Sequence, residues 1–161
     1  IVDIGSDRSQ LELCRWAVDM MRDSMMDFPR VGKMFICVSS VMTWAKTRPA
    51  DPEGDPTAPI LEDEYKRRRA HAKFRAELEL EKHVTQQGRN TKGRFRTFIV
   101  CSGLQYGEGE DWLHGLFKAA WHLDTPALPV LAPGKQVVPM IHVDDLASLV
   151  HCVLETPPEA R

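Results

Sequence analysis

Three short apolar runs, separated by longer segments of helical periodicity, constrain the fold of this chain most. The runs cover residues 33–38, 95–101 and 137–142. An apolar run of this length is typical of a strand that is buried on both faces. The remaining segments are predicted to be helical: 7–26, 62–87, 111–123 and 144–154. Alternation of helices and strands predicts an α/β fold with a mainly parallel sheet covered by helices.

The composition fits one domain and excludes several classes of protein. The chain has 161 residues, of which 43% are hydrophobic, so it can bury a sizeable core. Its net charge of −2 does not indicate a nucleic-acid or anionic-membrane partner. No apolar run approaches the roughly 18 residues of a membrane span. Because the chain begins at Ile1 rather than at a methionine, we expect a further N-terminal segment in the parent protein.

The cysteines favour a reduced, intracellular protein with buried thiols. They are far apart in the sequence: Cys14, Cys37, Cys101 and Cys152. No cysteine or histidine pair has the spacing of a zinc site, so no metal is predicted.

Three motifs stand in order between residues 33 and 150. They are F-I-C-V-S-S-V-M-T-W at 35–44, R-T-F-I-V-C-S-G-L-Q-Y-G-E-G at 96–109, and H-V-D-D-L-A at 142–147. Together they resemble the extended short-chain dehydrogenase/reductase family of NAD-dependent epimerases and dehydratases. The resemblance implies a Rossmann-like, doubly wound parallel sheet that is incomplete, because the N-terminal βαβ units would precede this segment. Residues 1–161 would then form a single segment, the C-terminal part of such a domain.

A further set of segments points to a narrower family. Residues 40–45, 103–107, 126–130 and 141–143 resemble proteins of motile cilia and flagella in which an epimerase-like domain precedes a nucleoside monophosphate kinase domain. This resemblance implies a cytoplasmic location in the axoneme. It implies other axonemal proteins of a large assembly as partners, rather than nucleic acid or membrane. Any kinase activity would lie outside this segment, which has no phosphate-cradling loop with its set of arginines.

The family's proton-transfer residues are not intact in this chain. The chemistry implied by the resemblance needs a Tyr, a Lys four residues later, and a Ser or Thr that bonds the substrate oxygen. Ser40 takes the Ser/Thr position. One register aligns Arg69 with the Tyr and Lys73 with the Lys; the other keeps Tyr65 but places Arg69 at the Lys position. An arginine stays protonated and cannot act as the base. We therefore predict no intact catalytic set, with Ser40, Tyr65 and Lys73 as remnants.

The sequence also contains little evidence of a nucleotide-binding site. The chain has no G-x-G-x-x-G after a strand, and the glycines at 103, 107 and 109 lack the Lys-Ser/Thr of a phosphate loop. In the family, the dinucleotide fingerprint lies upstream of this segment, and an intact upstream half would allow NAD(P) binding. Ser40 and Lys73 are weak candidates for cofactor contacts, and the resemblance makes His142 a candidate substrate-side residue.

Several smaller features have structural explanations. The basic run at 66–69 is interpreted as a solvated helix face rather than a nucleic-acid site. Asp144 or Asp145 is expected to cap the last helix. The apolar residues near 112–121 are expected to pack a helix onto the sheet or onto a partner.

Two functional hypotheses remain open. The first is a non-catalytic scaffold domain, in which the Pro-rich, acidic insertion at 47–60 would serve as a docking loop. The second is an active NAD(P)-dependent epimerase, dehydratase or reductase with an unusual arrangement of Ser40, Tyr65 and Lys73.

Overall fold

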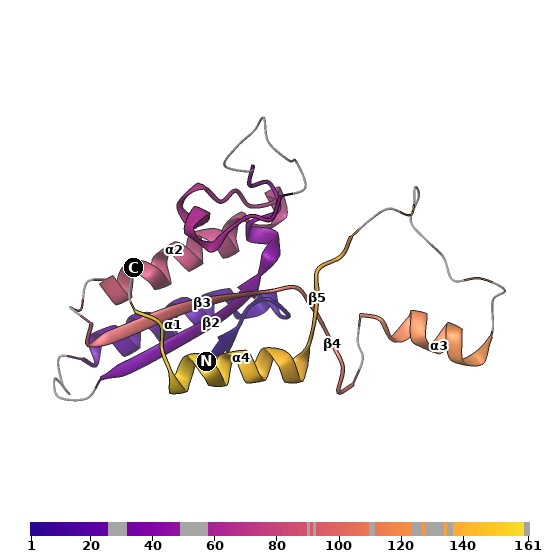
Figure 1. Ribbon diagram of the computed structural model, residues 1–161. Helices are drawn as coiled ribbons and strands as arrows, with labels where there is room; N and C mark the ends of the chain where they lie inside the picture. Colours follow the sequence, from indigo (N-terminus) through magenta and orange to yellow (C-terminus); the bar gives the residue numbers. More distant parts are fainter. Residues whose placement is uncertain are drawn as a thin grey trace. The chain divides into compact units, whose positions relative to one another are not determined.

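The computed structural model divides into two compact units, Ile1–Cys101 with Glu159–Arg161 (unit 1) and Ser102–Pro158 (unit 2). Figure 1 shows the elements of each. The structure describes residues 1–25, 32–48, 58–89, 91, 93–109, 112–123, 127, 134 and 137–159. Most of the predicted insertion at 47–60, namely residues 49–57, lies outside the described residues.

Unit 1 is built on a three-stranded sheet with the order β1-β2-β3. The strands are β1 (Val2–Asp3), β2 (Lys33–Ser40) and β3 (Phe95–Ser102). β1 runs parallel to β2, with Val2 opposite Cys37. The predicted strands at 33–38 and 95–101 are confirmed, whereas the short β1 was not anticipated. Residues 35–39 of β2 are all buried, as expected for a central strand.

Two helices pack with the sheet of unit 1. Helix α1 (Leu11–Asp23) follows the short 3-10 helix η1 (Arg8–Gln10), and helix α2 (Arg75–Arg89) precedes β3. α1 contacts α2, and both contact β2. Their apolar faces close one core with the sheet, formed by Ile4, Cys14, Val18, Met25, Phe35, Cys37, Leu80, Val84 and Phe95. The four cysteines are free thiols, and those in this core are buried.

The long helix predicted at 62–87 is wrong in its first half. Residues 62–74 form two short 3-10 helices, η3 (Glu62–Arg67) and η4 (Ala72–Phe74), and α2 begins only at Arg75. The backbone at Arg68 and at His71 is extended, with ψ of 142° and 149°. This stretch bonds to the turn after β2 instead: Lys46 N–H donates to the Arg69 carbonyl at 2.9 Å, and His71 N–H donates to the Met42 carbonyl at 3.0 Å. These long-range bonds replace the i to i−4 bonds of a helix.

Unit 2 has its own two-stranded parallel sheet. β4 (Leu104–Tyr106) pairs with β5 (Met140–His142), with Gln105 opposite Ile141. The helices are α3 (His114–His122) and α4 (Val143–Glu155). The strand predicted at 137–142 is confirmed over its last three residues. β4 was not predicted from the sequence.

The cap of α4 is a histidine rather than an aspartate. His142 is the N-cap residue, and its Nδ1 accepts from the Asp144 N–H at 3.2 Å. The prediction that Asp144 or Asp145 caps this helix is therefore wrong. Both lie in the first turn, where the helix dipole favours negative charge.

In the part of the chain that the structure describes, no helix is long and apolar enough to cross a membrane.

Candidate functional site

The end of β2 is where a parallel α/β sheet would place a ligand, because ligands of such folds bind beyond the carboxyl ends of the strands. Ser39 and Ser40 form this end, and the 3-10 helix η2 (Val41–Thr43) follows directly. Ser39 and Thr43 are fully buried. The strand end is therefore not an open edge but is covered by side chains from other elements.

A buried carboxylate fills the space beside the end of β2. Glu81 lies on α2 and is fully buried. Ser39 Oγ donates to Glu81 Oε1 at 2.5 Å, and Arg68 Nη2 pairs with Glu81 Oε2 at 2.8 Å. Thr43 Oγ1 lies 3.8 Å from Cys101 Sγ, which in turn lies 4.0 Å from Glu81 Oε1. We call Ser39, Thr43, Arg68, Glu81 and Cys101 the strand-end cluster.

The titration behaviour of the cluster is dominated by burial. Burial raises the pKa of Glu81, and the bond from Ser39 and the charge of Arg68 only partly oppose this effect. Burial and the neighbouring Glu81 carboxyl also raise the pKa of the Cys101 thiol, which makes it a poor nucleophile. The Arg68 guanidinium lies 5.7 Å from the centre of the Trp44 ring, so its position is held from two sides.

A second buried carboxylate lies one helical turn before Glu81. Glu77 is fully buried and forms an ion pair with Arg8 Nε. Arg8 also donates from Nη2 to the Lys73 carbonyl at 2.6 Å, and its guanidinium lies 5.2 Å from the centre of the Phe74 ring. Both inward-facing carboxylates of α2 therefore have an arginine partner that arrives from a distant part of the sequence.

The structure does not bring the three remnant catalytic candidates together. Ser40 Oγ accepts from the Met42 N–H at 3.2 Å and so caps η2. The Tyr65 hydroxyl accepts from Arg89 Nη2 at 3.1 Å, and Arg89 lies eight residues, about 12 Å of helix, beyond Glu81. Lys73 is exposed in η4. Among the described residues, no hydrogen bond or ion pair joins these three side chains.

Arg69, which aligns with the family's Tyr or Lys, is held through its backbone. Its N–H donates to Thr47 Oγ1 at 2.9 Å and its carbonyl accepts from Lys46, while its side chain is exposed. The inward-facing arginine of the basic run is its neighbour Arg68.

His142 lies in unit 2, where it has local contacts. Besides capping α4, its ring stacks edge-on against Tyr106 at 5.2 Å between ring centroids. Gly107 has a positive φ of 98°, and a Cβ there would overlap the His142 ring. The glycine therefore leaves the space in which this ring sits.

Sequence reasoning did not identify the residues that form the strand-end cluster with Ser39. The four consecutive cations at 66–69 contain no sign that Arg68 turns inward. The segment E-L-E-L-E at 77–81 was a signal that could have been used. At 100° per residue, a helix face that contains both leucines also contains Glu77 and Glu81, and leaves only Glu79 outside it. Arg8 carries no local signal for its contact with Glu77.

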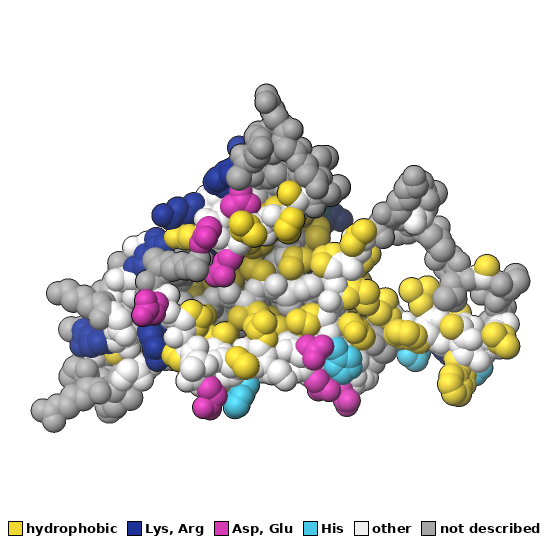
Figure 2. Space-filling model, in the orientation of Figure 1, with side chains coloured by type: hydrophobic (Ala, Val, Ile, Leu, Met, Phe, Trp, Pro, Cys, Tyr) yellow, Lys and Arg dark blue, Asp and Glu magenta, His cyan; other side chains and the backbone are white. Residues whose placement is uncertain are grey.

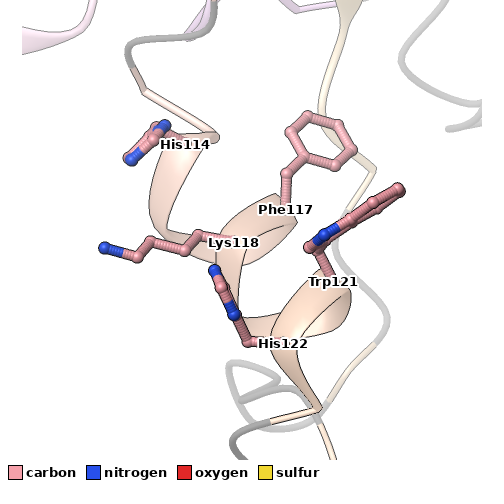
Figure 3. Close-up of a pocket in the computed structure, with 5 residues that line it drawn as sticks. All are labelled: His114, Phe117, Lys118, Trp121 and His122. Atoms are coloured by element: carbon pink, nitrogen blue, oxygen red, sulfur yellow. The ribbon is translucent and has the colours of Figure 1, made fainter.

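Two further surface features could hold a ligand. One runs along α3, where His114, Lys118 and His122 form one row beside Phe117 and Trp121, as Figure 3 shows. All five side chains come from one helix, so this is a helix face rather than a cavity between elements. The other is a concavity in unit 1 lined by Arg48, Lys66, Arg67, Arg68 and Arg69. No cluster of three or more potential metal ligands occurs within the described ranges.

Comparison with known proteins identifies relatives of the chain. No family model matches it. Adenylate kinase 7 of Mus musculus is 40% identical over 159 residues, which is 99% of this chain and 25% of that protein. Adenylate kinase 7 of Macaca fascicularis is 44% identical over 82 residues, which is 51% of this chain and 15% of that protein. The chain thus spans about a quarter or less of the curated relatives that it matches.

Among solved structures, the chain resembles dTDP-glucose 4,6-dehydratase from Bacillus anthracis, determined in complex with NAD. The TM-score is 0.62 at 12% identity, and the match covers 98% of this chain and 48% of the dehydratase. This likeness and the parallel strand pairs confirm the predicted Rossmann-like α/β fold, with small sheets in this chain.

Proposed function

Since the chain is homologous over almost its whole length to a quarter of adenylate kinase 7, we propose that it is a non-catalytic, Rossmann-like scaffold domain of an adenylate kinase 7-like protein. Any nucleoside monophosphate kinase activity then belongs to other parts of the parent chain. The ciliary and axonemal setting of the proposal rests on the family resemblance of the sequence. In this view the segment contributes a folded surface to a large axonemal assembly.

The observation that carries the proposal is how the strand end is used. Glu81 and Arg68 form a buried ion pair beside the end of β2. Ser40 Oγ caps η2 by accepting a hydrogen bond from the Met42 N–H. The Tyr65 hydroxyl is bonded to Arg89, away from Ser40. Proton transfer to a substrate needs the acid/base group within hydrogen-bond reach of the reacting atom. These side chains are committed to holding the fold instead.

The test is cofactor binding by the full-length parent protein. NADH and NADPH are titrated by nicotinamide fluorescence, and NAD and NADP by thermal shift, up to millimolar concentration. We expect no change in fluorescence and no rise in the unfolding temperature. A ligand that bound the folded protein would raise this temperature by mass action. Tight binding that is weakened by Ser40→Ala together with Lys73→Ala would show a cofactor-sensing domain instead of a plain scaffold, and turnover by the same protein would overturn the non-catalytic proposal.

One observation favours a second candidate function. The dehydratase that this fold resembles was solved in complex with NAD. An NAD(P)-dependent epimerase, dehydratase or reductase would therefore be the alternative, with Ser40, Tyr65 and Lys73 rearranged when cofactor binds. The same titration separates the alternatives, and turnover of a nucleotide-linked sugar by the full chain would decide for the enzyme.

The scaffold role has a separate test in ciliated cells. A tagged full-length protein should remain in axonemes after detergent extraction, and a version lacking residues 1–161 should be retained less. Equal retention of both would contradict a docking role for this segment.

A further inference from the structure

Five cationic side chains line one open concavity of about 350 Å³ in unit 1. They come from two segments: Arg48 follows η2, while Lys66, Arg67, Arg68 and Arg69 run from the last turn of η3 into the extended stretch after it. Figure 2 shows Lys and Arg side chains gathered along the part of unit 1 that carries α2, with acidic side chains between them. We call the concavity lined by these five residues the basic groove.

Two of the five cations are already neutralised by the protein. Arg67 Nη1 pairs with Glu64 Oε1 at 3.0 Å, and Arg68 pairs with the buried Glu81. Arg48, Lys66 and Arg69 form no ion pair within the described part of the chain. The groove therefore keeps three cationic groups that no carboxylate of the described residues balances. Their mutual repulsion would be relieved by an anionic partner.

The backbone around the groove is held in place before any ligand arrives. The Arg69 N–H and carbonyl bond to Thr47 and Lys46, which directly precede Arg48, so the two lining segments are tied together. Lys66 Nζ lies 5.7 Å from the centre of the Tyr65 ring. A preformed arrangement lowers the ordering cost of binding.

The chemistry of the groove favours carboxylates over phosphates. Arginine forks bind carboxylates and phosphates alike with two parallel hydrogen bonds, so the four arginines of the groove suit either anion and its surroundings must discriminate between them. Phosphate sites usually add backbone N–H groups at a helix N-terminus. Here the lining residues stand at the C-terminal end of η3, whose N-terminal turn carries Glu62, Asp63 and Glu64. Among the described residues, no aromatic side chain lines the groove to stack a nucleic-acid base.

We propose that the basic groove binds an acidic, Glu- or Asp-rich peptide segment of a protein partner. The proposal deepens the scaffold function by naming the surface that docks, and it rests on that function for the partner being a protein. Arg48, Lys66 and Arg69 are the residues that contact the partner's carboxylates. Arg67 and Arg68 shape the groove while remaining paired with Glu64 and Glu81.

The test measures binding of a fluorescein-labelled oligoglutamate peptide to the full-length protein by fluorescence anisotropy. The variant Arg48→Gln/Lys66→Gln/Arg69→Gln removes the three unpaired charges and should weaken binding about tenfold. Binding of the wild type should also weaken as salt is raised, because exposed charges are screened. An oligoglutamine peptide of the same length should not bind.

A matched control removes three charges elsewhere. The variant Arg15→Gln/Arg94→Gln/Arg96→Gln changes the net charge equally but spares the groove, and should weaken binding less than about twofold. Thermal unfolding checks that both variants are folded. Equal loss in the two triple variants would overturn the proposal, since it would show a general charge effect.

Two competitor probes distinguish other ligand chemistries. Inorganic phosphate and single-stranded oligothymidylate are added to the peptide complex at matched charge. Weak displacement by both supports an acidic peptide. Tighter binding of either probe than of oligoglutamate, lost in the groove variant, would assign the groove to a phosphate ligand and refute the proposal. If the wild-type protein binds NAD(P) and also binds oligoglutamate through the groove, only the scaffold function is contradicted. The failure of the scaffold function and the failure of the groove proposal can therefore be told apart.

Discussion

Unit 1 and helix α3 use the same kinds of residue in opposite ways. The core of unit 1 buries Phe35 and Phe95, which are 2% and 0% exposed, although Trp16 on α1 is 61% exposed. Unit 1 also buries two glutamates behind arginines. On α3, Trp121 is 87% exposed and Phe117 53% exposed, beside Lys118 and two histidines of the same helix. Residue type alone therefore does not decide burial. A side chain is buried where a second element supplies its contacts or its opposite charge.

This contrast predicts where the chain is sensitive to mutation. In unit 1, the contacts of a residue come from several elements, so its loss leaves a cavity or an unpaired charge. On α3, truncation of an exposed side chain removes surface that contacts few described neighbours.

The largest expected effect is loss of a core aromatic ring. Phe35→Ala should lower the free energy of unfolding by about 3–5 kcal/mol, because it removes a buried ring and leaves a cavity. Trp121→Ala removes a larger ring but should change it by less than about 0.5 kcal/mol, because the ring is mostly exposed. Urea denaturation of both variants measures the difference. Similar losses in the two variants would mean that α3 is packed against something in the folded protein.

Strands β2 and β3 and the end of β5 could be predicted from the sequence, but β1, β4 and the start of α2 could not. The runs at 33–38 and 95–101 are apolar because β2 and β3 are parts of a sheet, and local pattern records that directly. Residues 62–74 are polar and compatible with a helix. Their actual path is set by the bonds that the Lys46 N–H donates to the Arg69 carbonyl and the His71 N–H donates to the Met42 carbonyl, which join residues more than 20 positions apart. No periodicity within the segment can report such bonds.

The strand-end cluster lies beside one of the residues that the sequence singled out, but its other members were not predicted. The resemblance directed attention to Ser40 at the strand end, and its neighbour Ser39 is the hydroxyl that bonds the buried Glu81. Which arginine of the basic run turns inward depends on the extended backbone at Arg68, which follows from the same long-range bonds. A buried ion pair is a tertiary property, because each partner alone looks like a surface residue.

The second prediction breaks the ion pair of the strand-end cluster. Arg68→Gln leaves the buried Glu81 carboxylate without its charge partner and should lower the free energy of unfolding by about 3 kcal/mol. The matched control is Lys82→Gln, which breaks the exposed pair between Lys82 and Glu79 on the same helix. That change should cost less than about 0.5 kcal/mol. An equal loss of stability in both variants would show that Arg68 and Glu81 do not form a buried ion pair.

The third prediction concerns the glycine beside His142 in unit 2. Gly107→Ala forces an alanine to a φ of 98° and places its Cβ against the His142 ring. The backbone strain alone should lower the free energy of unfolding by about 1–3 kcal/mol, and the overlap with the ring adds to this loss. Gly109→Ala has a similar φ of 110° but no atom within 4 Å of the added Cβ. The difference between the two variants, measured by thermal unfolding, isolates the overlap with His142. A smaller loss for Gly107→Ala than for Gly109→Ala would place the His142 ring elsewhere.

The smallest effect expected is a pH dependence from the buried Glu81. Because burial raises the pKa of Glu81, the folded chain keeps a proton there at pH values where the unfolded chain has lost it. Between the ordinary pKa of a glutamate and the raised value, the stability contributed by this group therefore falls as pH rises, by at most about 1.4 kcal/mol per pH unit.

Glu81→Gln has no such proton to lose, so its free energy of unfolding relative to the wild type should rise with pH across that window. Urea denaturation at a series of pH values measures this difference. The exposed Glu79→Gln on the same helix is the control and should not reproduce the trend. A difference that falls with pH would show instead that Arg68 outweighs burial. Glu81 would then be kept charged in the folded chain by its ion pair with Arg68, as the glutamate of the exposed ion pair on α2 is.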